Sequence, residues 1–189
     1  MQRFTAERTS ETPDELWILQ HPPVFTQGQA GKPEHLLRDI GIPVVPIDRG
    51  GQITYHGPGQ AIVYVLVDLN RRQLKVKTLV NLIEQAVIDL LGRYGLTVNR
   101  REGAPGVYLG SSGEGPKIAA LGLRIRRGCA YHGVSLNVDL DLAPFSAINP
   151  CGYAGMSVTR TADLGIPLNV ETAGEALAHT LVATLEKRP

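Results

Sequence analysis

The stretch Ala61–Leu69 constrains the fold more than any other part of the chain. It is a near-continuous run of β-branched and apolar residues. Such a run predicts a strand that is buried on both faces, at the centre of a sheet. Two segments, Val76–Leu91 and Val170–Leu185, instead place apolar residues at helical spacing and predict amphipathic helices. The chain must therefore combine a buried sheet with helices that cover it.

Shorter patterns predict further strands around the central one. A buried strand is expected over Asp14–Gln20, and a strand interrupted by two prolines over Ile42–Ile47. The other expected strands cover 96–99, 106–109, 117–126 and 130–140, with a Gly- and Ser-rich turn at 110–116. Strands and helices are interspersed without a repeat or a linker. We therefore expect an α/β or α+β fold, with a mixed β-sheet and flanking helices, in a single domain over residues 1–189.

Composition and cysteine content narrow the class of protein. Hydrophobic residues make up 43% and charged residues 20% of the chain, as is ordinary for a soluble domain, and the net charge of +1 gives no indication of nucleic acid. No apolar run approaches the roughly 20 residues of a membrane span, and no secretory signal opens the chain. The two cysteines, Cys129 and Cys151, are expected to stay reduced. These features predict a cytoplasmic monomer without nucleic-acid or membrane partners.

The octapeptide Asn149–Met156 carries the first candidate for chemistry. It places Cys151 between Pro150 and Gly152, just past an apolar run. Proline removes a backbone donor and glycine tolerates unusual dihedral angles, so this thiol is expected on a turn, where reactive groups are often displayed. A free cysteine is also commonly a small buried hydrophobic residue. The octapeptide alone leaves both interpretations open.

Two further segments accompany this thiol. Arg49–Gln60 is a glycine-punctuated loop, and Pro116–Gly122 carries a single lysine, Lys117, at the start of an apolar run. Gly110–Gly115 precedes Pro116 and Lys117 rather than Lys-Ser or Lys-Thr, so it is not a phosphate-binding Walker loop. A Gly-x-Gly-x-x-Gly dinucleotide motif is also missing from the sequence. No nucleotide-binding site is therefore predicted.

These segments, in this order, resemble the octanoyltransferases of lipoate biosynthesis, within the wider group of biotin and lipoate protein ligases. The resemblance extends from about Trp17 onward. Besides the three segments described, it is carried by Ala104–Tyr108, Leu123–Gly128 and His132–Asn137. It implies the biotin/lipoate protein ligase catalytic-domain fold. It also implies the transfer of an octanoyl or lipoyl group from acyl-carrier protein to a lysine of a lipoyl domain. The acceptors would be the 2-oxoacid dehydrogenase complexes and the glycine-cleavage H protein.

The resemblance assigns the catalytic roles to Cys151 and Lys117. Cys151 matches the cysteine that carries the acyl thioester, and Lys117 matches its partner lysine. A neighbouring ammonium group favours the thiolate, which is the nucleophile, and the same lysine, once neutral, can accept a proton from an incoming amine. Because the acyl group arrives as a thioester, ATP is superfluous. No cofactor and no metal are therefore expected.

The resemblance also predicts the residues that line the acyl site. Glycines allow the backbone to approach a ligand closely, and backbone N–H groups could stabilise an oxyanion. Alanine and glycine on the Lys117 segment would leave room for an alkyl chain. The predicted substrate-binding residues are Arg49, Gly50, Gly51, Gln52, Ile53, Thr54, Tyr55, His56, Ala120, Leu121, Gly122, Gly133, Val134 and Ser135.

Alternatives exist for the catalytic base and for the activity. Because Cys–His pairs are common, His56 is the rival base, although we prefer a structural role in its loop for this histidine. A metal site formed by His56, His132 and Cys129 shows no ligand spacing and is rejected. The alternative activities are an ATP-dependent lipoate or biotin ligase, and a non-catalytic module that binds acyl-carrier protein. The cysteine in the Pro-Cys-Gly sequence argues against the first, and its pairing with Lys117 against the second.

Two expectations concern the surface and the amino terminus. Basic residues cluster at 71–77, 100–101 and 124–127, and they could dock an acidic carrier protein, although the sequence does not rank them. Met1–Arg8 resembles the late part of a helix that family members begin earlier, after a further strand. We therefore expect the native product to begin about twenty residues upstream.

Overall fold

A six-stranded antiparallel sheet forms the centre of the protein. The computed structural model describes residues 1–186. The strand order is β1 (Glu15–Leu19), β5 (Gln60–Asp68), β9 (Cys129–Asn137), β8 (Lys117–Arg126), β7 (Val107–Leu109) and β6 (Val98–Arg100). Every neighbouring pair is antiparallel. The predicted central strand is confirmed, because β5 lies between β1 and β9 and Val63 and Val65 on it are fully buried.

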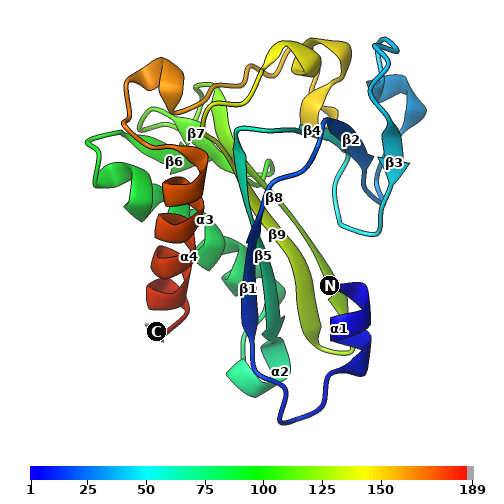
Figure 1. The fold of residues 1–189 in the computed structure, drawn as a ribbon, viewed down its shortest axis with the longest axis vertical. Helices are drawn as coiled ribbons and strands as arrows, with labels where there is room; N and C mark the ends of the chain where they lie inside the picture. Colours follow the sequence, from blue (N-terminus) through cyan, green and yellow to red (C-terminus); the bar gives the residue numbers. More distant parts are fainter. Residues whose placement is uncertain (187–189) are drawn as a thin grey trace.

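Two long helices cover one face of this sheet. They are α3 (Val76–Gly92) and α4 (Val170–Glu186), which lie together on one side of the strands (Figure 1). Leu79 and Ile83 of α3 and Leu177 of α4 are fully buried in the main core. Both helices begin where the apolar spacing predicts. None of the helices in residues 1–186 has the length and apolar character needed to cross a membrane.

Short helices join these elements. α1 (Gln2–Glu7) lies beside the far end of β9, and α2 (Leu69–Arg72) follows β5 directly (Figure 1). Asp68 caps α2 by accepting a hydrogen bond from the Arg71 N–H at 3.0 Å. Four 3₁₀ turns complete the helical elements: η1 (Pro33–His35), η2 (Ala143–Ala147), η3 (Pro150–Gly152) and η4 (Ala162–Leu164).

A second, three-stranded sheet stands beside the large one (Figure 1). Its order is β3 (Val44–Pro46), β2 (Val24–Gln27) and β4 (Ile53–His56). The pair of β2 and β3 is parallel and the pair of β2 and β4 is antiparallel. A separate small core fills one side of this sheet, formed by Phe25, Ile53, Tyr55, Leu140, Phe145, Ala147 and Ile148. The fold is therefore α+β, and the parallel pairing between named strands is confined to the small sheet.

The sequence patterns misjudged several parts of this arrangement, and they did not predict β2. The strand expected at Asp14–Gln20 forms as β1, but it is an edge strand rather than a buried one, and Ile18 is 47% exposed. The glycine-punctuated segment 49–60 was expected to be a loop, yet it contains all of β4. A strand of four residues between glycines gives too short an alternation to be recognised in the sequence.

Candidate active site

Cys151 occupies a turn of unusual backbone conformation. It lies in η3, and its φ of 56° and ψ of 18° are in the left-handed region. The turn is closed by hydrogen bonds from the Gly152 N–H to the Asn149 oxygen at 2.9 Å and from the Tyr153 N–H to the Pro150 oxygen at 3.1 Å. The turn expected from the sequence is therefore confirmed. A left-handed conformation costs a residue other than glycine about 1 kcal/mol or more, so the surrounding contacts must impose it.

Lys117, the first residue of β8, faces this thiol. The residue is 3% exposed, and Nζ donates to Cys151 Sγ at 3.2 Å and to the Pro105 oxygen at 3.1 Å. The backbone of Lys117 also pairs with the segment that follows the cysteine. Its N–H donates to the Ser157 oxygen, and its oxygen accepts from the Thr159 N–H, both at 2.9 Å. Two segments far apart in the sequence are thus held together at both backbone and side chain.

The charge of Lys117 depends on the sulfur beside it. Burial of the ammonium group is the largest influence on the pKa of Lys117 and lowers it, but Cys151 and Tyr108 together outweigh burial, so the pKa of Lys117 is raised. The other thiol differs: Cys129 begins β9, is 8% exposed, and burial raises its pKa. The expected packing role of Cys129 agrees with this environment.

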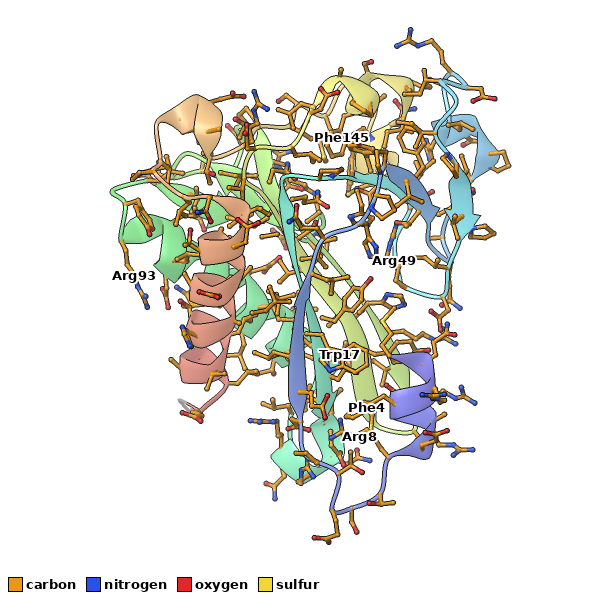
Figure 2. The ribbon with its side chains drawn as sticks, in the orientation of Figure 1. Phe4, Arg8, Trp17, Arg49, Arg93 and Phe145 are labelled. Atoms are coloured by element: carbon orange, nitrogen blue, oxygen red, sulfur yellow. The ribbon has the colours of Figure 1, made fainter. Side chains whose placement is uncertain are left out.

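Arg49 lies between the two sheets (Figure 2), with its side chain buried. Its guanidinium group donates to the Thr26 oxygen at 2.6 Å, to Thr26 Oγ1 at 2.9 Å and to the Gly50 oxygen at 2.8 Å. A β-carbon on Gly122 would come within 3.1 Å of Arg49 Cδ, so glycine at this point of β8 makes room for the arginine. Burial lowers the pKa of Arg49, and the Cys151 charge acts in the opposite direction.

The histidines near the site are held by their own partners. His56 Nδ1 lies 2.7 Å from Gln60 Oε1, and burial lowers the pKa of His56 to about 4. His132 Nε2 lies 2.8 Å from Asp48 Oδ1. The Cys151 thiol has its close contact with Lys117 and not with a histidine. Over residues 1–186, the acidic, histidine and cysteine side chains form no group of three suited to hold a metal ion.

A pocket of about 420 Å³ opens at the thiol. It is lined by both proposed catalytic residues, Cys151 and Lys117, and by most of the residues predicted to bind substrate: Arg49, Gly50, Gly51, Gln52, Thr54, His56, Ala120, Leu121, Gly122, Gly133, Val134 and Ser135. Ile53 and Tyr55 lie elsewhere. Both are buried in the small core beside Phe145, because alternate residues of β4 point to opposite faces.

Some pocket residues were not among those predicted to bind substrate. Val76 and Val80 line the pocket from the start of α3, and Gly103–Pro105 line it from the loop before β7. The sequence assigned the two valines to the core-facing side of their helix. Tyr153 also lines the pocket, and its hydroxyl group donates to the Gly103 oxygen at 3.0 Å.

Comparisons with known proteins agree with this geometry. The sequence profile of the lipoyl protein ligase A/B catalytic domain matches residues 1–182. An octanoyltransferase of Dechloromonas aromatica is 65% identical over 188 residues, which cover 100% of this chain and 90% of that protein. An octanoyltransferase of Aromatoleum aromaticum is 61% identical over 181 residues, covering 96% and 77% of the two chains.

Solved structures show the same fold at low identity. A bipartite lipoate protein ligase of Thermoplasma acidophilum aligns with a TM-score of 0.78 at 17% identity, covering 97% of this chain and 76% of that one. Lipoate-protein ligase A bound with ATP aligns with a TM-score of 0.75 at 17% identity, covering 97% and 77%. The chain thus belongs to the family of lipoyl protein ligase A/B catalytic domains. Within that family it belongs to the octanoyltransferases, which are acyltransferases of protein lipoylation.

Proposed function

We propose that octanoyl transfer by this chain proceeds through a thioester on Cys151, with acyl-carrier protein as donor and a lysine of a lipoyl domain as acceptor. The acceptors are lipoyl domains of 2-oxoacid dehydrogenase complexes and the glycine-cleavage H protein, and lipoyl can replace octanoyl as the transferred group. The observation that carries the proposal is the 3.2 Å contact between Lys117 Nζ and Cys151 Sγ at the pocket. It places a cation on the only thiol that lines the pocket within residues 1–186.

In the first step the Cys151 thiolate attacks the octanoyl carbonyl carbon. A carbon–sulfur bond forms to Sγ, and the bond to the donor's pantetheine sulfur breaks. The leaving sulfur takes a proton from the Lys117 ammonium group, so the donor departs as a free thiol. The products of this step are an uncharged thioester on Cys151 and a neutral Lys117 amine.

Lys117 then acts as the base in the second step. Once Sγ is acylated, the negative charge that does most to raise the pKa of Lys117 is gone, and burial, the largest influence, still lowers that pKa. A neutral Lys117 is therefore stable in the acylated enzyme. It accepts the proton when the acceptor amine attacks the thioester carbon. The bond to Sγ breaks, an amide is released, and the original thiolate and ammonium pair is restored.

The pocket is suited to an alkyl chain. Small residues, Ala120 and Gly122 on β8 and Gly133 on β9, line it beside Leu121 and Val134. Burying about seven methylene groups at about 0.8 kcal/mol each gives at most about 5 to 6 kcal/mol of binding free energy. One methylene group more or less changes this by only about 1 to 3 kcal/mol. Discrimination among acyl chain lengths should accordingly be incomplete.

The basic residues that could meet an acidic donor differ in their ion pairs and exposure. Arg71 and Arg72 bind Asp14, and Arg100 binds Glu84. Lys75 and Lys77 are exposed instead, and they flank Val76, which lines the pocket. An acidic carrier protein that inserts its acyl arm beside Val76 would meet these two ammonium groups. They are our candidates for the docking of the donor.

The test is the intact mass of the protein after mixing with octanoyl-acyl-carrier protein, without ATP. Wild type should gain one octanoyl group that hydroxylamine removes. Cys151→Ala should gain none, and the matched control Cys129→Ala should behave as wild type. Transfer to a lipoyl domain without an adduct, at undiminished rate in Cys151→Ala, would contradict the thioester. A requirement for ATP would favour the alternative of an adenylate-forming ligase.

A further inference from the structure

Glu84 places a carboxylate on the buried side of α3. The residue is 4% exposed, and Ile83 and Val87 beside it are fully buried. A buried charge is costly unless it is paired and hydrogen-bonded. Arg100 supplies the pair, with its Nε 3.1 Å from Glu84 Oε2. This ion pair engages one of the two carboxylate oxygens, and the other oxygen, Oε1, has a different partner.

Oε1 of Glu84 holds one peptide group of the loop before β7. The Gly106 N–H donates to Glu84 Oε1 at 2.8 Å. The carbonyl group of that same peptide bond belongs to Pro105, and its oxygen accepts a hydrogen bond from Lys117 Nζ at 3.1 Å. A peptide group is planar, and in the trans form its N–H and C=O point in opposite directions. Fixing the N–H therefore also fixes the direction of the carbonyl oxygen that contacts the lysine.

This peptide group lies directly against the lysine side chain. Gly106 has a φ of 135°, and a β-carbon on it would lie 2.7 Å from the Ala119 oxygen and 3.0 Å from Lys117 Cε. Glycine is the residue that allows the backbone to adopt this conformation and to come this close. A peptide group turned away from Glu84 would withdraw its oxygen from Lys117.

The Pro105 oxygen is the anchor of the Lys117 ammonium group. Within residues 1–186 it is the one oxygen that accepts a hydrogen bond from Nζ. The other close groups are Cys151 Sγ at 3.2 Å and the ring of Tyr108, whose centroid lies 5.0 Å from Nζ. A thiol sulfur is a weak acceptor, and an aromatic face holds a cation without a fixed hydrogen-bond direction. The placement of Nζ on the thiol thus depends on the Pro105 oxygen.

We propose that Glu84 is a positioning residue for octanoyl transfer. It orients the peptide group between residues 105 and 106, and the carbonyl oxygen of this group holds Lys117 against Cys151. This inference rests on the proposed roles of Lys117 and Cys151 and adds the group that places the lysine. Glu84 itself does not line the pocket.

The indirect arrangement suits the chemistry proposed for Lys117. A carboxylate in direct contact would favour the charged form of the lysine. A carbonyl oxygen carries no net charge, and it accepts a hydrogen bond from the ammonium group and from the neutral amine alike. The lysine is therefore fixed in position while it gives up a proton in the first step and takes one in the second.

Two substitutions at Glu84 separate position from charge. Glu84→Asp keeps the charge but withdraws the carboxylate by one methylene group. Arg100, whose side chain is 34% exposed, can follow it, whereas the buried backbone at Gly106 cannot. Glu84→Gln removes the charge but keeps an oxygen within reach of the Gly106 N–H, and Arg100 retains Gln85 Oε1 at 2.8 Å.

The readout is kcat and KM for octanoyl transfer, measured per folded molecule. The kcat should fall about 10- to 100-fold in Glu84→Asp and stay within about threefold of wild type in Glu84→Gln. The KM for octanoyl-acyl-carrier protein should stay within about twofold in both variants, because Glu84 lies outside the pocket. A wild-type kcat in folded Glu84→Asp, or an equally large loss in Glu84→Gln, would overturn the proposal.

Arg100→Met is the matched control for the ion pair. It breaks the contact with Glu84 Oε2 and leaves the Gly106 N–H on Oε1. Its stability should fall, yet its kcat should stay within about threefold of wild type. A loss of kcat as large as in Glu84→Asp would assign the effect to the ion pair and overturn the role of the Gly106 contact.

Glu84→Met is the second variant if Glu84→Asp does not fold. Methionine suits a helix face that is otherwise apolar, and it leaves the Gly106 N–H without its acceptor, so the same fall in kcat is expected. If neither variant folds, Glu84→Gln decides: a kcat within about threefold of wild type supports the proposal, and one lower by about tenfold or more overturns it.

The octanoyl adduct of wild type is measured alongside. A missing adduct would refute the thioester on Cys151. An adduct together with an undiminished kcat in Glu84→Asp or Glu84→Met would refute the role of Glu84 alone.

Discussion

The protein uses buried positive charge in two opposite ways. At the end of the large sheet away from the pocket, Arg8, Arg71 and Arg72 all contact one carboxylate, Asp14. At the pocket, the buried side chains of Lys117 and Arg49 have no carboxylate partner within residues 1–186, and Lys117 contacts the Cys151 thiol. The first arrangement places three cations on one anion and fastens α1, β1 and α2 together. The second leaves two buried cations without a carboxylate. The difference indicates which charges serve the fold and which serve the reaction.

The largest effect should follow from removing the lysine at the pocket. In Lys117→Met, octanoyl transfer should fall at least about a thousandfold, since the thiolate loses its close cation and the amine loses its proton acceptor. The melting temperature should change by only a few degrees, because methionine fills a similar volume. Transfer rate and thermal unfolding are measured on the same preparation. A large loss of stability with little loss of rate would show that Lys117 is a structural residue. The pocket charges would then not differ in role from those around Asp14.

The opposite pattern is expected at Asp14. Asp14→Asn leaves three arginines without their anion, and the unfolding free energy should drop by about 2 to 3 kcal/mol. The rate of transfer per folded molecule should stay within about twofold of wild type, because Asp14 lies outside the pocket. Urea unfolding followed by a transfer assay at a temperature where the variant is folded checks both parts. Loss of transfer in a fully folded variant would contradict a purely structural role.

The pH dependence of stability tests whether Asp48 is held by Tyr131 and His132. Although burial would raise the pKa of Asp48, hydrogen bonds from Tyr131 and His132 lower it to about 2. A carboxyl group with a lowered pKa contributes stability above its unfolded pKa of 3.8, and this contribution is lost as the pH falls toward the folded value. Between about pH 5 and about pH 3, wild type should therefore lose about 1 kcal/mol more than Asp48→Asn. Equal losses of stability in wild type and Asp48→Asn would show that Tyr131 and His132 do not lower the pKa of Asp48.

The smallest effect is expected at the surface near the pocket. Lys77→Glu should raise the KM for octanoyl-acyl-carrier protein about threefold and leave kcat unchanged, because an exposed charge alters encounter more than chemistry. Arg93→Glu is the matched control, since Arg93 follows the other end of α3 and points away from the rest of the molecule (Figure 2). High salt should remove the difference between the two variants. The same KM in both variants would place donor docking elsewhere.

Much of this arrangement was predictable from the sequence. The apolar run of β5 and the helical spacing of α3 and α4 predict the large core. Pro150 and Gly152 predict a turn at Cys151, and the family resemblance names Lys117 as its partner. These signals are local, or they reside in contiguous motifs, and a single sequence can display them.

The rest depends on contacts between distant segments. The approach of Lys117 to Cys151 requires the pairing of Lys117 with Val158, which no local pattern encodes. The basic clusters show the same dependence on distant contacts. No local pattern indicates that Arg71 forms an ion pair with Asp14, which lies just before β1. The same dependence applies to Ile53 and Tyr55. They fall in a motif that lines the pocket, but strand alternation turns them into the small core. Motif membership and side-chain direction are separate properties.

The left-handed backbone at residue 151 has a consequence for the evolution and engineering of this chain. A selection for stability alone would favour glycine at this position, since glycine adopts a φ of 56° without the steric cost that a cysteine side chain incurs. Libraries screened only for heat resistance should therefore drift toward enzymes that fold better and no longer turn over. Recovering cysteine at residue 151 from such a screen would require activity to be part of the selection.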